Sequence, residues 1–261
     1  MIMAPQHLGR VFEPRSGLLR SENAAWKCLD RCCAKLGIGS LPIPIPIDEW
    51  IELALDIRFG VCDLSHLGED VIGAAFVRDR EILVSDRVLN HNGRFRFTCA
   101  HELGHVLLHQ KHAAVFHETH ELPYLEAIRL ERQADQFAAA ILMPMRMMER
   151  AVLDICNGER LDLEYCLTEM MMPTLESEWL WRAIFLPRLT RHFGVSRTAV
   201  IIRCIDMRLV THPARSFLPL RFRDRLVQRA QEFNLRFMRI VDGRPVVPST
   251  RSTSKATADG I

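Results

Sequence analysis

The sequence predicts an α+β fold in which a small sheet is followed by long helices and then by a mainly helical C-terminal part. Three observations favour this class. Short strand-like segments lie between residues 58 and 84, two long segments of helical periodicity follow them, and further helical pattern extends to about residue 209. The 261 residues are 48% hydrophobic and 25% charged, which is typical of a globular protein with a substantial core.

The N-terminal segment is expected to contain two helices joined by an extended stretch. A helix is predicted for residues 22–36, because Gly37 and Gly39 follow it directly. Residues 41–47 alternate proline with aliphatic residues and should be extended, since proline fixes φ and disfavours helix in the residue before it. Asp48 would then be the N-cap of a second, short helix.

Three short strands are predicted after this helix, at residues 58–62, 71–78 and 81–84. The charged run at residues 77–81 marks a hairpin turn between the last two strands. The chain then enters a helix that carries the main chemical motif. Residues 145–185 are expected to form further helices without a chemical signature of their own.

The most informative stretch is the pentapeptide His-Glu-Leu-Gly-His at residues 101–105. Histidines four residues apart lie on one face of a helix, so His101 and His105 can reach a single cation. Glu102 can reach a water molecule bound to that cation and accept its proton. Two neutral imidazoles, an adjacent carboxylate and an open coordination position are the features of a hydrolytic zinc site.

A third ligand is needed to complete such a site. Lys111 stands where one class of zinc proteases has its third histidine, which excludes that class. His109 lies one turn further along the same face and would place three ligands in a line, so we expect it to pack or to support a ligand. Glu131 is the better candidate, with Asp135 four residues later to orient a ligand histidine. The remaining alternatives are His117, His120 and Glu126.

The second long helix, which carries Glu131, is predicted for residues 126–143 and is ended by Pro144. Its apolar residues recur at helical spacing, at Leu130, Ala134, Phe137, Ala138 and Ile141. Small residues flank the two acidic positions. They would allow this helix to approach the motif helix closely at Gly104.

Two segments of the chain resemble the ImmA/IrrE-type metallo-endopeptidase family. The first is Arg96-Phe97-Thr98-x-Ala100-His101-Glu102-Leu103-Gly104-His105, with His109 behind it. The second is Glu131-x-x-Ala134-Asp135-x-Phe137-Ala138-Ala139-x-Ile141-Leu142-Met143-Pro144. With the strands before the motif, the resemblance covers about residues 45–145, and Gln133 departs from the acidic residue expected at its position.

The resemblance implies a small zincin-like metallopeptidase domain of the gluzincin type. In that domain zinc would be held by His101, His105 and Glu131, Glu102 would be the general base, and Asp135 and His109 would support the ligands. Manganese could replace zinc in vitro. The candidates for stabilising an oxyanion are Tyr124, His117 and His120. We expect this domain to span residues 41–185, after an N-terminal extension of residues 1–40.

The family also commonly carries a helix-turn-helix-like element, and we predict one within residues 186–247. Gly194 would be the turn glycine, Ser196 the N-cap, and Arg197 and Thr198 the start of a recognition helix. Residues 187–261 hold 15 Lys/Arg against 5 Asp/Glu, a net charge of +10, whereas the preceding part holds 19 against 27, a net charge of −8. A basic C-terminal part could bind DNA or attract the acidic body.

The resemblance implies that the protein cleaves one specific intracellular protein, such as a helix-turn-helix transcriptional repressor, and so acts in transcription regulation or a stress response. The alternative is a transcriptional regulator that keeps the zincin fold but acts by binding DNA through residues 186–245. A third hypothesis is a helical interaction module whose histidines are incidental.

A soluble, cytoplasmic protein without a membrane partner is expected. The first 20 residues contain no apolar run, and the most apolar window, residues 137–143, is far shorter than a membrane span. The eight cysteines are scattered along the chain, as is typical of reduced and mostly buried thiols. Residues 248–261 are rich in Ser and Thr and are expected to be a disordered tail.

Overall fold

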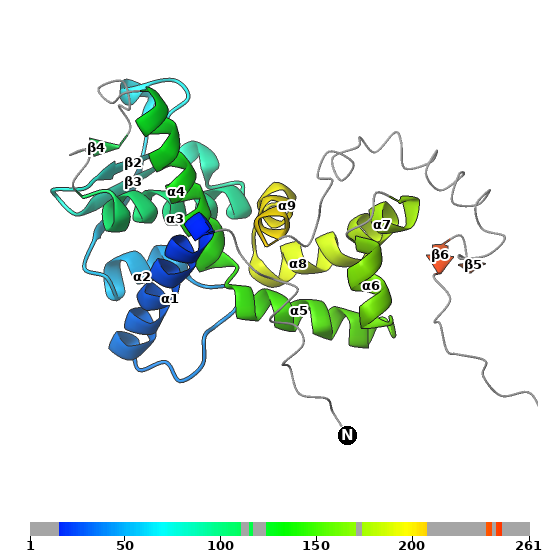
Figure 1. Ribbon diagram of the computed structural model, residues 1–261. Helices are drawn as coiled ribbons and strands as arrows, with labels where there is room; N and C mark the ends of the chain where they lie inside the picture. The colour runs from blue at the N-terminus through cyan, green and yellow to red at the C-terminus, as the bar shows by residue number, and fades with distance from the viewer. Residues whose placement is uncertain are drawn as a thin grey trace, which may run out of the picture.

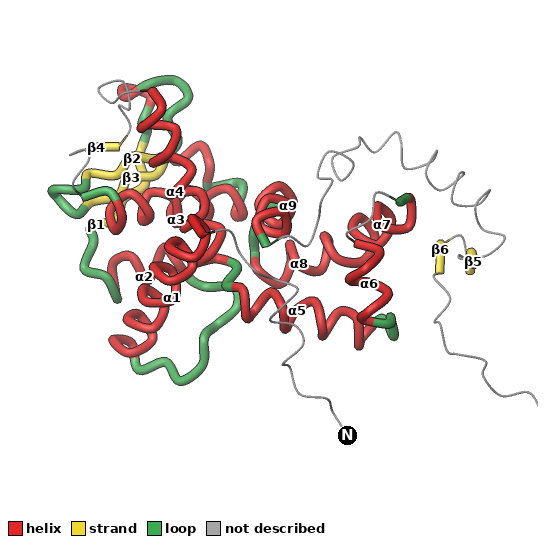
Figure 2. Tube along the Cα trace, viewed as in Figure 1, coloured by secondary structure: helices red, strands yellow, loops and turns green. Residues whose placement is uncertain are grey.

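A small mixed sheet and the longest helices lie at one end of the molecule, and shorter helices form the other (Figure 1). The computed structural model describes residues 16–110, 115–116, 124–170, 174–207, 239–241 and 244–246. Within these residues the α+β class predicted from the sequence is confirmed, and helices make up most of the regular structure (Figure 2). The division of the chain into domains stays a prediction, and the expected tail lies outside the described residues.

Two helices joined by the proline-containing stretch open the described part of the chain. Helix α1 (Ser16–Leu36) ends where Gly37 takes φ +66°, as the predicted C-terminus requires. Helix α2 (Ile47–Leu53) begins two residues earlier than predicted and has Pro46 at the N-cap position, so the expectation that Asp48 is its N-cap is wrong. The carbonyl of Pro46 accepts the first helical hydrogen bond, from Trp50 N at 3.1 Å. Asp48 therefore lies in the first turn, where its charge still complements the helix dipole.

Within the described part of the chain the sheet has four strands, and it confirms the three strands predicted from the sequence. Its spatial order is β1 (Arg58–Cys62), β3 (Glu81–Ser85), β2 (Gly73–Phe76) and β4 (Val115–Phe116). Strand β1 is parallel to β3, whereas β2 is antiparallel to both β3 and β4. Two 3-10 turns lie in the connections, η2 (Ser65–Leu67) and η3 (Asp86–Val88). Strand β2, at the centre of this arrangement, is the strand that packs most closely on the motif helix.

The two helices that carry the predicted metal ligands pack directly against each other. They are α3 (Asn92–Leu108), which carries the His-Glu-x-x-His motif, and α4 (Tyr124–Leu142). At Gly104 the helices approach so closely that a Cβ atom would lie 3.2 Å from the Cα atom of Ala134 and 3.2 Å from Cδ1 of Phe137. The five apolar residues of α4 that were predicted to recur at helical spacing are all buried in the core. Helix α1 lies against α4 and adds Cys28, Leu29 and Cys32 to the same core.

The C-terminal helices form the second group in Figure 1. They are α5 (Met145–Gly158), α6 (Leu163–Met170), α7 (Leu175–Trp179), the π-helix η5 (Leu180–Phe185), α8 (Leu186–Phe193) and α9 (Arg197–Asp206). A hairpin, β5 (Arg239–Val241) and β6 (Arg244–Val246), follows. Gly194 has φ +62°, and the Ser196 hydroxyl accepts a hydrogen bond from Ala199 N at 3.1 Å. The turn glycine and the N-cap are therefore placed as the sequence predicts, whereas the role of this pair of helices as a helix-turn-helix stays a prediction.

Helix α9 is tied to the core by Arg203, whose side chain is 0% exposed. Its Nε donates to the carbonyl of Met143 at 2.9 Å, and its guanidinium pairs with the buried carboxylate of Glu22 on α1. A buried charge is tolerated only when it is paired, so this contact specifies how α9 packs on α1 and α4.

Six of the eight cysteines are buried, Cys33 is partly buried, Cys62 is exposed, and all eight are unpaired. Among the described residues, no helix combines the length and the apolar character that crossing a bilayer would require. The expected cellular location stays a prediction.

Arg96 fixes the N-terminal half of α3 to the turn between α8 and α9. Its guanidinium donates to the carbonyls of Phe193 and Gly194, both at 2.9 Å, and to the carbonyl of Ile45 at 2.5 Å. Arg96 is 7% exposed, so these carbonyls depend on it for hydrogen bonds that water cannot readily replace. The α8–α9 turn also packs on α3 at Gly93, where a Cβ atom would lie 2.7 Å from the backbone nitrogen of Ser196.

The substitution Arg96→Leu is therefore expected to lower the free energy of unfolding by about 3 kcal/mol, because three buried carbonyls lose a charged donor. Urea denaturation followed by circular dichroism measures this change. Arg94→Leu is the matched control, since Arg94 is exposed on the same helix and its loss should leave the midpoint nearly unchanged. Equal midpoints for the two variants would contradict the assignment.

Candidate metal centre

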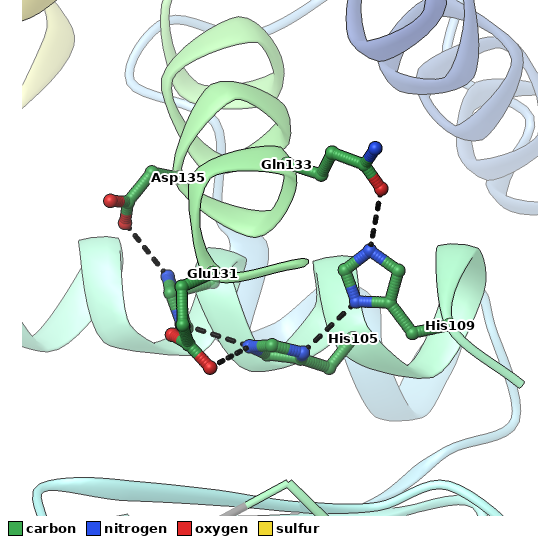
Figure 3. Close-up of polar contacts among 6 residues, drawn as sticks. His105, His109, Glu131, Gln133 and Asp135 are labelled. Atoms are coloured by element: carbon green, nitrogen blue, oxygen red, sulfur yellow. Dashed lines mark hydrogen bonds and ion pairs between the residues drawn. The ribbon is translucent and has the colours of Figure 1, made fainter. Parts of the chain in front are cut away.

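Three side chains predicted as metal ligands meet between α3 and α4. His101 and His105 lie one turn apart on α3, and Glu131 of α4 completes the group. Figure 3 shows Glu131 facing His105. His101 Nε2 lies 3.0 Å from His105 Nε2 and 3.2 Å from Glu131 Oε2. His105 Nε2 lies 3.6 Å from Glu131 Oε1. The two Nε2 atoms and the carboxylate of Glu131 therefore lie close enough together to share one metal ion.

These separations suit a small divalent cation. Ligand atoms at zinc-bond lengths of about 2.0–2.1 Å in a tetrahedron lie about 3.3 Å from one another. The observed distances of 3.0, 3.2 and 3.6 Å are spread around that value. Two imidazole nitrogens and one carboxylate form the donor set of many hydrolytic zinc sites, and they leave a fourth position for water or substrate. The cluster is thus compatible with a metal ion.

Each histidine of the cluster is held by a contact at its other ring nitrogen. His101 Nδ1 lies 2.9 Å from Asp135 Oδ1, one turn along α4 from Glu131. His105 Nδ1 lies 3.0 Å from His109 Nδ1, and His109 Nε2 lies 3.1 Å from Gln133 Oε1 (Figure 3). Such contacts fix the orientation of a ligand ring and determine which nitrogen remains available to a metal.

The electrostatics of the cluster favour a cation at its centre. Burial lowers the pKa of His101, but hydrogen bonds to Asp135 and Glu131 outweigh burial and raise that pKa to about 10. Burial opposes the ionised form of Glu131, but its contacts with His101 and His105 hold the pKa of its carboxyl well below the usual range. Burial lowers the pKa of His105, which favours the neutral form that can bind a metal. A divalent cation would replace the proton held between His101 and the carboxylates.

Glu102 lies next to this cluster in a nearly closed environment. Glu102 is only 5% exposed, and its Oε2 atom has no hydrogen-bond partner among the described residues. Burial raises the pKa of its carboxyl to about 8, with a further increase from Glu131 and a decrease from His101. A carboxylate with a pKa near neutrality can both accept and release a proton.

Gly73 of β2 makes room for Glu102. A Cβ atom at this position would lie 2.4 Å from Glu102 Oε1 and 2.7 Å from Thr98 Cγ2, so no other residue fits without moving the carboxylate. Sequence reasoning did not single out Gly73, although a glycine inside a predicted strand often marks a close approach. Gln133 was noted only as a departure from the family pattern, because its partner is 24 residues away in sequence.

A cleft of about 400 Å³ opens onto the cluster and Glu102. Residues 70–73, which lead into β2, line one wall of the cleft, and Phe97 and Thr98 of α3 also line it. Arg87 supports that wall, because its guanidinium donates to the carbonyl of Glu69 at 2.6 Å and to the carbonyl of Val71 at 2.7 Å. The cleft is large enough for a segment of peptide or a small ligand.

Other predicted site residues do not belong to this cluster or cannot be placed. Glu126 lies on α4 but is not one of the three residues that meet. His117 and His120 lie outside the described residues, and only the backbone of Tyr124 is described, at the start of α4. Arg197 and Thr198 are exposed at the start of α9 and do not line the cleft. The oxyanion candidates therefore stay predictions.

The comparison with known families agrees with this geometry. A peptidase family model, described as the IrrE N-terminal-like domain, matches residues 61–204, which are 144 of the 261 residues. The match includes β2, β3, α3 and α4 and continues through α8 to most of α9. No curated protein is significantly similar to the chain in sequence.

Glu131→Gln should weaken zinc binding, because the substitution removes the anionic ligand. The loss should exceed the roughly 10–100-fold that follows loss of an outer-shell partner. Competition with a chelator of known affinity measures it. Glu126→Gln serves as the matched control on the same helix and should bind zinc as the unmodified protein does. The ligand assignment would be overturned if Glu126→Gln lost zinc and Glu131→Gln retained it.

Proposed function

The chain belongs to the peptidase family of the IrrE N-terminal-like domain, and we propose that it is a zinc-dependent endopeptidase acting on one specific intracellular protein. The observation that carries this proposal is the convergence of His101, His105 and Glu131 beside the buried Glu102 in a single cleft. A helix-turn-helix transcriptional repressor is the proposed substrate class, in line with the resemblance of the motif residues. Cleavage of such a repressor would release transcription.

His101, His105 and Glu131 would hold the zinc ion. When bound, zinc polarises the scissile carbonyl and lowers the pKa of its bound water. Glu102 would accept the proton of that water through its unpartnered Oε2 atom and pass it to the leaving amine. Burial supports this role, because it raises the pKa of Glu102 and so makes its carboxylate a better acceptor of that proton.

Strand β2 is the proposed docking edge for an extended substrate. The carbonyl of Ile72 accepts a hydrogen bond from Ser85 N on the β3 side. Because polar groups alternate along a strand, those of Gly73 are directed to the opposite edge. Among the described residues, β4 pairs with β2 only at Ala75 and Phe76 and does not cover the edge beside Gly73. Gly73 is also the residue of β2 that lies against Glu102. A peptide added there would bring its backbone to the cluster.

A second candidate function is DNA binding through the C-terminal part. It is favoured by one observation: Arg197 and Thr198 are exposed at the start of α9, directly after the capped turn. Other side chains of α9, including Val200 and Arg203, are buried, and the preceding turn packs on α3. This arrangement leaves few side chains to read bases, so we propose a packing role for α8 and α9 in preference to DNA recognition.

Glu102→Gln should keep zinc affinity but lower the rate of cleavage by about 10²–10⁴-fold or more, because the amide cannot accept the proton. Incubation with zinc and candidate repressors, followed by mass spectrometry of the fragments, measures the rate. Glu49→Gln on the exposed face of α2 is the control and should cleave normally. Normal cleavage by Glu102→Gln would refute the mechanism.

Arg197→Ala separates the two candidate functions. We expect host cells to tolerate this substitution but to lose function with Glu102→Gln, because Arg197 lies outside the cleft. DNA affinity measured across a salt series gives the second readout, with Arg150→Ala, at an exposed residue of α5, as the control. The protein would be a DNA-binding regulator if Arg197→Ala abolished function and reduced the slope of DNA affinity against salt concentration by about 1, while Glu102→Gln had no effect.

A further inference from the structure

His109 is a buried residue that contacts the metal cluster through the Nδ1 atom of His105. It follows α3 as the C-cap residue and is 1% exposed. In Figure 3 one nitrogen of His105 points toward Glu131 and the other toward His109. His109 in turn reaches Gln133 on α4, so a line of contacts runs from the cluster through two rings to an amide, with steps of 3.0 and 3.1 Å.

With both rings neutral, this line has two consistent arrangements of protons. In the first, His105 Nδ1–H donates to His109 Nδ1, and His109 Nε2–H donates to the amide oxygen of Gln133. In the second, the Gln133 amide group is turned and donates to His109 Nε2, and His109 Nδ1–H donates to His105 Nδ1. The orientation of one amide therefore selects the tautomer of both histidines.

Only the first arrangement allows His105 to bind a metal ion. It leaves the lone pair on His105 Nε2, the atom that lies 3.0 Å from His101 Nε2 in the cluster. The second arrangement puts a proton on that atom. In the structure it is Oε1 of Gln133 that faces His109, which corresponds to the first arrangement.

We propose that Gln133 and His109 are positioning residues that hold His105 in its metal-binding tautomer and thereby set the metal affinity of the centre. The proposal rests on the metal centre proposed above. It assigns different supports to the two histidine ligands. His101 is oriented by the half-exposed carboxylate of Asp135, whereas His105 is oriented by an uncharged pair whose histidine is fully buried. An amide at position 133 supplies the acceptor without placing another charge beside a buried ring.

Two variants of the full chain test this role at pH 8, with Zn²⁺ alone as the probe. Gln133→Leu removes the acceptor and should weaken zinc binding by about 10–100-fold in a chelator competition. Gln133→Glu keeps an acceptor oxygen and has no donor amide, so it should bind zinc at least as tightly as the unmodified protein. Gln136→Leu makes the same chemical change three residues further along α4 and should leave the affinity unchanged.

The tautomer of His105 is the second readout, measured by ¹⁵N NMR of the metal-free protein. We expect the Nδ1–H form in the unmodified protein and a mixture of both forms in Gln133→Leu. Unchanged affinity and an unchanged tautomer in Gln133→Leu would overturn the proposal, as would equal losses of affinity in Gln133→Leu and Gln136→Leu. If the unmodified protein bound no zinc, the proposed function would fail, and the tautomer of His105 in Gln133→Leu would still decide the positioning role.

Discussion

The close packing of α3 on α4 at Gly104 is the contact on which the rest of the site depends. Because a Cβ atom there would press on Ala134 and Phe137, glycine allows the two helix backbones to approach within the reach of short side chains. Glu131, Gln133 and Asp135 can then contact the two histidines of the facing helix and His109, its C-cap residue. A larger separation would break these contacts, which offset the cost of burying the polar rings of His105 and His109.

The sheet encloses Glu102, which the packing of α3 on α4 alone does not bury. Strand β2 packs on α3 so closely at Gly73 that the carboxylate of Glu102 occupies the space of a missing side chain. Burial then raises the pKa of Glu102 to about 8, while hydrogen bonds keep Glu131 ionised nearby. Two carboxylates within one cleft thus have different protonation properties because their surroundings differ. That difference is what a site with one metal-binding carboxylate and one proton-transferring carboxylate requires.

The C-terminal helices support the site from the outside. Arg96 connects the turn after α8 to α3, and Arg203 connects α9 to α1 and to the end of α4 at Met143. Both arginines are buried, so each specifies one packing arrangement through charged hydrogen bonds. These contacts give a physical reason why the family match extends to residue 204, well beyond the two segments that carry the chemistry.

Local periodicity in the sequence was enough to predict the strands, the two long helices and the pairing of His101 with His105 and of Glu131 with Asp135. Spacing within one helix decides which side chains share a face, and the hydrophobic pattern decides which face is buried. The tertiary structure alone decided that Gly73 admits Glu102, that Gln133 reaches His109 and that Arg96 holds the α8–α9 turn. Those contacts join residues 24 to 98 positions apart, and no periodic pattern within a single element encodes which distant partner will face it.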